Sequence, residues 1–319
     1  MSVRVEQIQT SLLQPEMDSA YPLQGEFGVE VLRVAEGADG QRYGKALLFD
    51  YSGHAEIYLP AARWGGTLPS APTQGGIAIE FQYNRQGALV PVAVPASTDA
   101  VEPRYALELL PSHRVPNPDD LRRLVHLADW LQLPVNRDFL AAVFADQAFA
   151  HAFLTLPAGA RCHHSHAGGL LSHSLEVAEG VLAHCNGENP YLEDAAVLTG
   201  LLHDVGKVLL SGPAGSVVPC EYRDHAELID VALGVSMPLL KEADDIAHWA
   251  LWRVVTAYKR QRYYEVPEAK LVAALDAVSA QRDVRRNGRG GGTGRLWQQG
   301  CGGQRIWSPP DGSMKHLDW

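Results

Sequence analysis

A histidine and an aspartate stand side by side at one point of the chain. His203 and Asp204 lie in the segment EDAAVLTGLLHDVGKVLL, where Asp204 falls on the apolar stripe of a helical pattern. A carboxylate that is buried without a counter-charge is strongly unfavourable, so this position calls for a cation or a metal ion. For an isolated pair, a hydrogen bond to a neighbouring imidazole or to a helix terminus is the simpler interpretation.

The pair is not isolated, because three other segments carry an imidazole or a carboxylate. His173 lies in HSLEVAEGVLAHC, His225 in EYRDHAELID and Asp276 in KLVAALDAV, each within a helical apolar pattern. Four helices can therefore bring nitrogen and oxygen ligands to one point. Such ligands suit Mn²⁺, Mg²⁺, Fe²⁺ or Zn²⁺ better than a metal that prefers thiolates. A divalent ion polarises a phosphoryl oxygen and lowers the pKa of water to about 7.

The order of these residues resembles the HD superfamily of metal-dependent phosphohydrolases. The stretch HHSHAGGLLSHSLEVA, followed by LLHDVGKVLLSGPAG and EYRDHAEL, is similar to the HD domain of the YhaM-type 3′-to-5′ exoribonucleases. In that family an OB-fold domain precedes the HD domain. The same stretch is similar to the HD region of MobH-type, TraI-like conjugative relaxases. The close similarity covers about residues 162–230, and it is weaker over residues 231–285.

The resemblance implies a role for individual residues. It implies that the core metal ligands are His173, His203, Asp204 and Asp276, and that His225 binds a second metal. Lys207, in the HDxGK segment, would meet a substrate phosphate, and Asp204 and Lys207 would take part in catalysis. The alternative for Lys207 is a solvated lysine without a functional contact. The alternative for His225 is an imidazole that forms a hydrogen bond to a metal ligand without binding the metal itself.

The chain departs from the exoribonuclease pattern at one place. Those enzymes have a histidine pair that closes a helix before the last aspartate, whereas this chain reads IAHWALWRVVTAY. His248 is retained as a candidate ligand, and Arg253 is a candidate substrate contact. A second metal is therefore in doubt, while hydrolysis with a single metal is not.

The three histidines that precede His173 need a separate account. His163, His164 and His166 fall in a loop that ends in Gly168 and Gly169, before the expected helix. Imidazoles beside a metal can bind phosphate, act as a general acid or complete the ligand set. His164 is the first choice for a catalytic role by its position in the motif, and His163 and His166 are candidate substrate contacts. A capped loop with one structural imidazole is the alternative.

The sequence patterns around these residues predict the elements that position them, and together they indicate an α+β multidomain chain. The runs GVEVLRVAE, KALLFDYSG, AEIYLPA and GIAIEFQY read as strands of a small OB-like β-barrel. From Pro116 onward the patterns are helical, including one helix over 117–133, a second over 138–154 and one across EDAAVLTGLLHDVGKVLL. We expect a barrel over 1–100, a helical connector over 101–158, an all-α HD domain over 159–286 and an irregular Gly/Arg-rich tail over 287–319.

The composition excludes some classes of protein. The chain of 319 residues is 46% hydrophobic and 20% charged, as expected for a folded domain rather than a disordered one. Its four cysteines are far apart and form no CxxC pair, which argues against a zinc knuckle or a disulfide framework. Neither a signal peptide nor a membrane-spanning run is evident, so we expect a cytoplasmic protein without a membrane partner.

These observations leave three functions open. The first is a phosphodiesterase or nuclease that acts on single-stranded RNA or DNA, with 3′-to-5′ exonuclease activity and Mn²⁺ as the first choices. On this reading Tyr43, Phe49, Tyr51 and Tyr58 are candidate stacking platforms, although aromatic residues in strands are more often core. The alternatives are a nucleotide phosphohydrolase and a non-catalytic HD module that binds nucleic acid in DNA processing or conjugation. The net charge of −10 argues against a wholly nucleic-acid-binding surface, and a homo-oligomer stays an open alternative.

Overall fold

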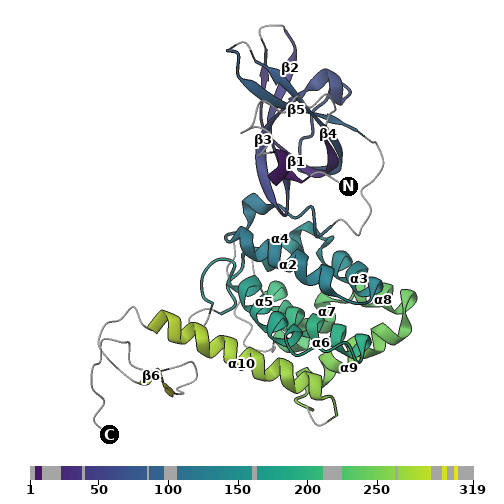
Figure 1. The fold of residues 1–319 in the computed structure, drawn as a ribbon, viewed down its shortest axis with the longest axis vertical. Coiled ribbons are helices and arrows are strands. Elements are labelled where there is room, and N and C mark those ends of the chain that lie inside the picture. The colour runs from purple at the N-terminus through teal and green to yellow at the C-terminus, as the bar shows by residue number, and fades with distance from the viewer. Residues whose placement is uncertain are drawn as a thin grey trace. The chain divides into compact units, whose positions relative to one another are not determined.

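The chain divides into two compact units (Figure 1). The computed structural model describes residues 4–8, 23–37, 40–84, 86–96, 106–159, 164–210, 225–262, 265–288, 297–299 and 305–307. One unit comprises Met1–Asp129 and Leu140–Ala150, and the other comprises Trp130–Phe139 and His151–Trp319. A β-barrel followed by a helical region is therefore confirmed, while the expected connector contributes residues to both units.

The first unit contains a closed barrel with the strand order β1-β2-β3-β5-β4. Its strands are β1 (Leu23–Glu36), β2 (Arg42–Asp50), β3 (Gly53–Pro60), β4 (Thr73–Tyr83) and β5 (Leu89–Pro95), with the 3₁₀ helix η1 (Ala61–Trp64) after β3. The long strand β1 pairs antiparallel with both β2 and β4. Its register shifts between Val31 and Arg33, and such a bulge bends a strand toward a second neighbour.

Strand β5 was not among the strands named from the sequence, because Pro91 and Pro95 interrupt its apolar run. The structure shows why prolines are tolerated there. β5 forms a full antiparallel ladder with β4, but its parallel pairing with β3 consists of Tyr58 opposite Val92. A strand with one short ladder has positions where a backbone N–H is not needed.

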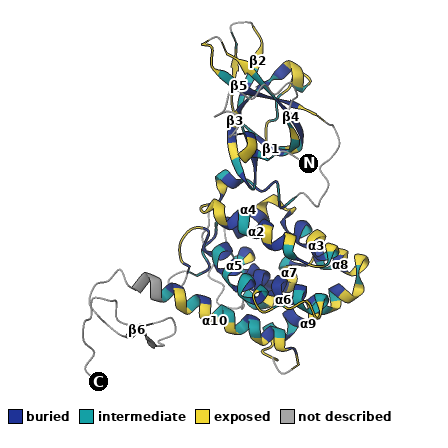
Figure 2. Cartoon of the chain, viewed as in Figure 1, coloured by how far each residue is buried: buried dark blue, intermediate teal, exposed yellow. Residues whose placement is uncertain are grey.

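Alternating apolar residues of the strands fill the barrel (Figure 2). The buried set is Phe27, Val29, Ala46, Leu48, Ala55, Ile57, Leu59, Ile77, Ile79 and Ala93, together with Val5 and Ile8 from the N-terminal segment. Phe49 is only 4% exposed and its ring lies 4.9 Å from that of His113, in the 3₁₀ helix η3 (Ser112–Arg114). Phe49 is therefore a core residue, and its interpretation as a stacking platform was wrong.

The helical elements follow the barrel in sequence. They are α2 (Pro118–Trp130), α3 (Pro134–Phe144), α4 (Gln147–Thr155), α5 (Gly169–Leu182), α6 (Pro190–Leu202), η4 (Val205–Leu210), η6 (His225–Leu228), α7 (Ile229–Ala232), α8 (Ser236–Ala243), α9 (Asp245–Lys259) and α10 (Pro267–Gly288). The helix predicted over 117–133 is confirmed as α2, which ends at Trp130. The single helix predicted over 138–154 is divided, because Asp146 caps a new helix by accepting hydrogen bonds from the amides of Ala148 and Phe149.

The helix predicted across EDAAVLTGLLHDVGKVLL also ends earlier than expected. Asn189 caps its start by accepting a hydrogen bond from the amide of Leu192, and α6 ends at Leu202. Residues 205–210 then form the 3₁₀ helix η4. His203 and Asp204 consequently lie in a turn between two helices, where adjacent side chains can converge more closely than on a continuous helix.

Four helices of the second unit pack around the turn that carries His203 and Asp204. α6 packs against α5, α9 and α10, and α10 also packs against α5 and α9. Figure 2 shows the buried residues along α5 and α6. The mainly irregular tail that we expected contains the end of α10 and a pair of short strands, β6 (Trp297–Gln299) and β7 (Arg305–Trp307). Among the described helices, none has the length and apolar character needed to cross a membrane.

Candidate metal centre

Three side chains from separate segments of the helical unit meet at one point. His173 projects from α5, His203 follows α6, and Asp276 lies on α10. Nε2 of His173 is 3.2 Å from Nε2 of His203 and 3.2 Å from Oδ1 of Asp276. Nε2 of His203 is 3.8 Å from the same carboxylate oxygen. The two imidazoles are 0% and 1% exposed, so these three groups form a buried candidate metal centre.

The other nitrogen of each imidazole is turned away from this point. Nδ1 of His203 lies 2.8 Å from the carbonyl oxygen of Gly200, which can only accept a hydrogen bond, so Nδ1 carries the proton. Nδ1 of His173 lies 3.0 Å from Oγ of Ser279. In the neutral ring of His203, Nε2 then presents a lone pair to the centre.

The carboxylate of Asp276 is also oriented by a partner outside the centre. Its Oδ2 accepts a hydrogen bond from the hydroxyl of Tyr258 at 3.1 Å, which leaves Oδ1 facing the imidazoles. Burial raises the pKa of the Asp276 carboxyl, but His173 and His203 outweigh this effect, and the pKa is lower than usual. Asp276 is therefore ionised at neutral pH.

Asp204 places a second carboxylate beside both imidazoles. Its Oδ2 is 3.5 Å from Nε2 of His203 and 3.7 Å from Nε2 of His173. Its Oδ1 is 3.0 Å from Nε2 of His225, and the ammonium group of Lys207 donates a hydrogen bond to Oδ2. Burial raises the pKa of the Asp204 carboxyl, but His203, His225 and Lys207 hold it well below the usual value. The buried charge therefore has counter-charges, as its burial requires.

The separations and the chemistry of these donors fit a divalent metal ion. Ligand atoms about 2.1 Å from an ion and at right angles to each other lie about 3 Å apart, and the donor atoms of His173, His203 and Asp276 lie 3.2–3.8 Å apart. Lone pairs that face one another repel unless a positive charge lies among them. Burial lowers the pKa of His173, so the doubly protonated, cationic form of that ring is disfavoured. A metal ion is the cation that three or more such donors can share.

Two glycines allow close contacts between backbone segments around the centre. A Cβ on Gly169, the first residue of α5, would lie 1.9 Å from the carbonyl oxygen of His164. A Cβ on Gly206 would lie 2.0 Å from the carbonyl oxygen of His225. Side chains at these positions would push the His164 loop away from α5, and η6 away from η4.

The loop histidines lie in different surroundings. His164 has a left-handed backbone conformation with a φ of 43°, is 2% exposed, and its ring centroid lies 5.2 Å from that of His173. Its backbone amide donates a hydrogen bond to Asp283 at 2.6 Å, and its Nε2 lies 3.3 Å from Oγ of Ser279. His166 is exposed, with its ring centroid 6.0 Å from that of His164. His163 lies outside the described residues.

The structure does not bring His248 or Arg253 to the centre. His248 lies on α9 ten residues before Tyr258, a distance of about 15 Å along a helix. Its ring packs against Trp249, with 5.8 Å between centroids. Arg253 forms an ion pair with Glu265 at 3.1 Å. Their proposed roles as a metal ligand and a substrate contact gain no support from these positions.

Sequence reasoning missed the residues that orient the ligands. Asp276, Ser279 and Asp283 contact the centre or the His164 loop from α10. Their spacing of three and then four residues places them on one face of the helix. That spacing, within an otherwise apolar or exposed pattern, was a signal that could have identified Ser279 and Asp283. Tyr258 and Glu176 carried no comparable signal.

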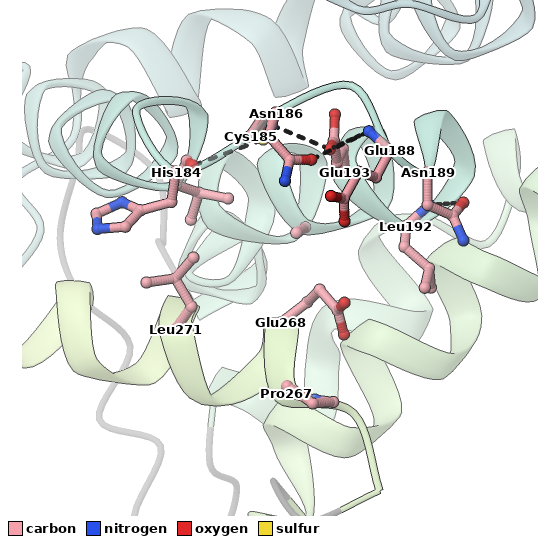
Figure 3. A pocket seen from close by; sticks show the side chains of 12 residues that line it. His184, Cys185, Asn186, Glu188, Asn189, Leu192, Glu193, Pro267, Glu268 and Leu271 are labelled. Carbon is pink, nitrogen blue, oxygen red and sulfur yellow. Dashed lines mark hydrogen bonds between the residues drawn. The ribbon is translucent and has the colours of Figure 1, made fainter.

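A pocket of about 300 Å³ lies elsewhere in the helical unit, where the end of α5 and the start of α6 face the start of α10 (Figure 3). Cys185 lines it, and burial raises the pKa of this thiol to about 11, so the thiol stays protonated at neutral pH. Glu193, on the same wall, accepts hydrogen bonds from the amides of Asn186 and Gly187. The pocket includes none of the ligands of the candidate centre, so it is a separate feature.

The described residues thus place two imidazole nitrogens and the carboxylate of Asp276 around one point, with the carboxylate of Asp204 3.5–3.7 Å from both imidazoles. A lysine and a third imidazole lie beside one of those carboxylates. Comparison of the chain with protein-family models, with curated proteins and with solved structures found no match.

Proposed function

We propose that the helical unit is a divalent-metal phosphohydrolase of the HD type. The observation that carries the proposal is the convergence of His173, His203 and Asp276 within 3.2–3.8 Å, with Asp204 beside both imidazoles. The resemblance of the same residues to the HD superfamily supports it independently. Mn²⁺ is the first choice of metal, and Mg²⁺, Fe²⁺ and Zn²⁺ remain alternatives for ligands of this type.

The residues around the centre have distinct tasks in this proposal. A divalent ion bound there supplies Lewis acidity toward a phosphoryl oxygen and lowers the pKa of water. Lys207 and His225 are more exposed than Asp204, at 20%, 38% and 4% of their side chains respectively. A phosphate that approaches from solvent therefore meets these two side chains, and the lysine offers it a positive charge.

Features of the barrel favour a phosphodiester in single-stranded nucleic acid as the substrate. We propose that the barrel is of the OB type, a fold whose strand faces bind single strands. Tyr43 and Lys45 share one face of β2, and Lys45 is paired in register with Tyr58 of β3. Aromatic rings beside a cation can stack on bases and contact the backbone. Exonuclease action from the 3′ end is the first choice, from the resemblance.

Ion pairs on the same barrel favour a second candidate, a nucleotide phosphohydrolase. Lys45 lies 2.6 Å from a carboxylate oxygen of Glu56, and Arg63 lies 3.0 Å from one of Glu80. A nucleic-acid phosphate has to compete with these carboxylates. On this alternative the barrel serves another purpose, and the helical unit acts on free nucleotides.

A parallel assay separates the candidates. The full chain, loaded with Mn²⁺, is incubated with an end-labelled single-stranded RNA, the matching DNA and free nucleotides. Shortening of an oligonucleotide that is lost in Asp276→Asn and His203→Ala supports the nuclease, whereas release of phosphate or nucleoside from free nucleotides alone supports the alternative. His184→Ala, an exposed histidine of the same unit, is the matched control and should retain activity.

Binding without turnover is the remaining outcome of that assay. Salt-sensitive binding of single strands that survives His203→Ala and Asp204→Ala, with no cleavage of any substrate under any divalent metal, would contradict both catalytic proposals. It would identify the protein as a non-catalytic nucleic-acid-binding module.

A further inference from the structure

The hydroxyl of Ser279 lies between three side chains near the candidate metal centre. Its Oγ is 2.7 Å from Oε2 of Glu176, 3.0 Å from Nδ1 of His173 and 3.3 Å from Nε2 of His164. Ser279 is 4% exposed and lies on α10 one turn after Asp276. One hydroxyl therefore links α5, α10 and the loop that precedes α5.

The number of hydrogen bonds that a hydroxyl can donate and accept fixes the direction of these three hydrogen bonds. A serine hydroxyl has one proton to donate and can accept two hydrogen bonds. The carboxylate of Glu176 can only accept, so the proton of Ser279 is directed to Glu176. The two imidazoles must then donate to Ser279, from Nδ1 of His173 and from Nε2 of His164.

We infer that Ser279 is a positioning residue that sets the tautomers of His173 and His164. The Nδ1–H tautomer of His173 leaves its Nε2 lone pair directed at His203 and Asp276, as a metal ligand requires. Glu176 has an indirect part, because it holds the hydroxyl proton away from Nδ1 of His173.

The same inference gives His164 a different task from the catalytic one expected from the sequence. Its Nε2 is directed at Ser279 and its backbone amide at Asp283, so both interactions run to α10. His164 thus anchors the loop to the helix that carries Asp276. Ser279 and Asp283, four residues apart on one face, receive the imidazole and the amide of the same residue.

The part of the inference that concerns metal affinity rests on the proposed metal centre, but the tautomer assignment does not. It is tested by ¹⁵N NMR of the histidine rings in the full chain with a chelator present. The chain has 13 histidines, and the signals of His173 are identified by their loss in His173→Ala. Wild type should show the Nδ1–H tautomer at His173.

Variants of the two partners should change that spectrum. Ser279→Ala should give a mixture of tautomers at His173 and raise the dissociation constant for Mn²⁺ by about 10- to 100-fold. Ser279→Thr, which keeps a hydroxyl, should restore both. Glu176→Ala removes a partly exposed side chain, so it tests the inference even where Ser279→Ala fails to fold. It frees the hydroxyl proton to turn toward His173, and should shift that ring toward the Nε2–H tautomer.

Ser174→Ala is the matched control. Ser174 is a buried residue beside His173 whose hydroxyl has no hydrogen-bond partner in the described part of the chain, so its removal should leave the tautomer unchanged. A His173 tautomer that is the same in wild type and Glu176→Ala, and in Ser279→Ala where it folds, overturns the inference, whatever happens to metal affinity. A wild type with the Nδ1–H tautomer that binds no divalent metal supports the inference and instead contradicts the proposed metal centre.

Discussion

The hydroxyl of Tyr258 donates a hydrogen bond to Oδ2 of Asp276 over a distance of 3.1 Å. Tyr258 lies on α9 and Asp276 on α10, so the bond joins two helices that pack against each other. The tyrosine ring also meets the imidazole of His203 edge to face, with 5.8 Å between centroids. One side chain that is not itself a candidate ligand therefore contacts two that are.

The first prediction concerns this tyrosine. Tyr258→Phe keeps the ring but removes the hydroxyl, so the Asp276 carboxylate loses the partner that orients it. We expect the dissociation constant for Mn²⁺ to rise by about tenfold, and the metal-free protein to lose about 1 kcal/mol of unfolding free energy. Metal titration by calorimetry and denaturation in chelator measure the two effects.

Tyr191→Phe is the control for that variant. The Tyr191 hydroxyl also reaches a carboxylate, Oδ2 of Asp244, at 3.4 Å. Because neither residue belongs to the centre, this variant should leave Mn²⁺ affinity unchanged. Equal losses of affinity in the two variants would show that Tyr258 acts through general stability, and not through Asp276.

The sequence identified the residue types at the centre better than it identified their surroundings. His173, His203, Asp204 and Asp276 were all named from their patterns, and the structure brings them together. The helical pattern that indicated a buried Asp204 continues past the end of the helix, because α6 ends at Leu202. The carboxylate is buried by a turn and by η4, and periodicity alone cannot predict such a chain reversal.

The roles of the supporting residues could not be predicted, because these roles depend on contacts between distant segments. Ser279 lies 106 residues from His173 in the chain, and Asp283 lies 119 residues from His164. The spacing of Ser279 and Asp283 from Asp276 marks one shared face of a helix, but it does not show which distant residues that face contacts. By contrast, four barrel strands were predicted correctly, because alternation between inward and outward residues is a local pattern.

A second prediction tests the position of His248. Because this residue lies about 15 Å along α9 from Tyr258, His248→Ala should leave the metal content of the protein unchanged. Elemental analysis of the purified variant beside wild type is the measurement. A lower metal content in a variant that keeps its thermal stability would place His248 back among the ligands.

A third prediction concerns acid stability in the absence of metal. The folded-state pKa of Asp204 lies well below the ordinary value of 3.8. The ionised carboxylate therefore stabilises the fold fully above that ordinary value, and the stabilisation is lost as the pH falls toward the lowered pKa. Asp204→Asn removes this contribution, so wild type should be the more stable protein at about pH 5, and the difference should narrow at about pH 3.

Chemical denaturation in chelator at the two pH values measures that difference. Asp194→Asn is unsuitable as a control, because its carboxylate caps α3 through the amides of Gln132 and Leu133. Asp138→Asn serves instead, since Asp138 is an exposed residue of the same unit. A stability difference between wild type and Asp204→Asn that stays constant with pH would contradict the prediction.

The divalent metal ion that we propose at His173, His203 and Asp276 is open to direct measurement. The most direct test is the metal-to-chain ratio after loading with Mn²⁺ and removal of free ions, measured by elemental analysis for wild type, His203→Ala, Asp276→Asn and the control His184→Ala. We expect about one ion per chain or more in wild type and in the control, with a large loss in the other two variants. Equal ratios in all four proteins, or no retained ion in wild type with Mn²⁺, Mg²⁺, Fe²⁺ or Zn²⁺, would contradict the proposed metal centre.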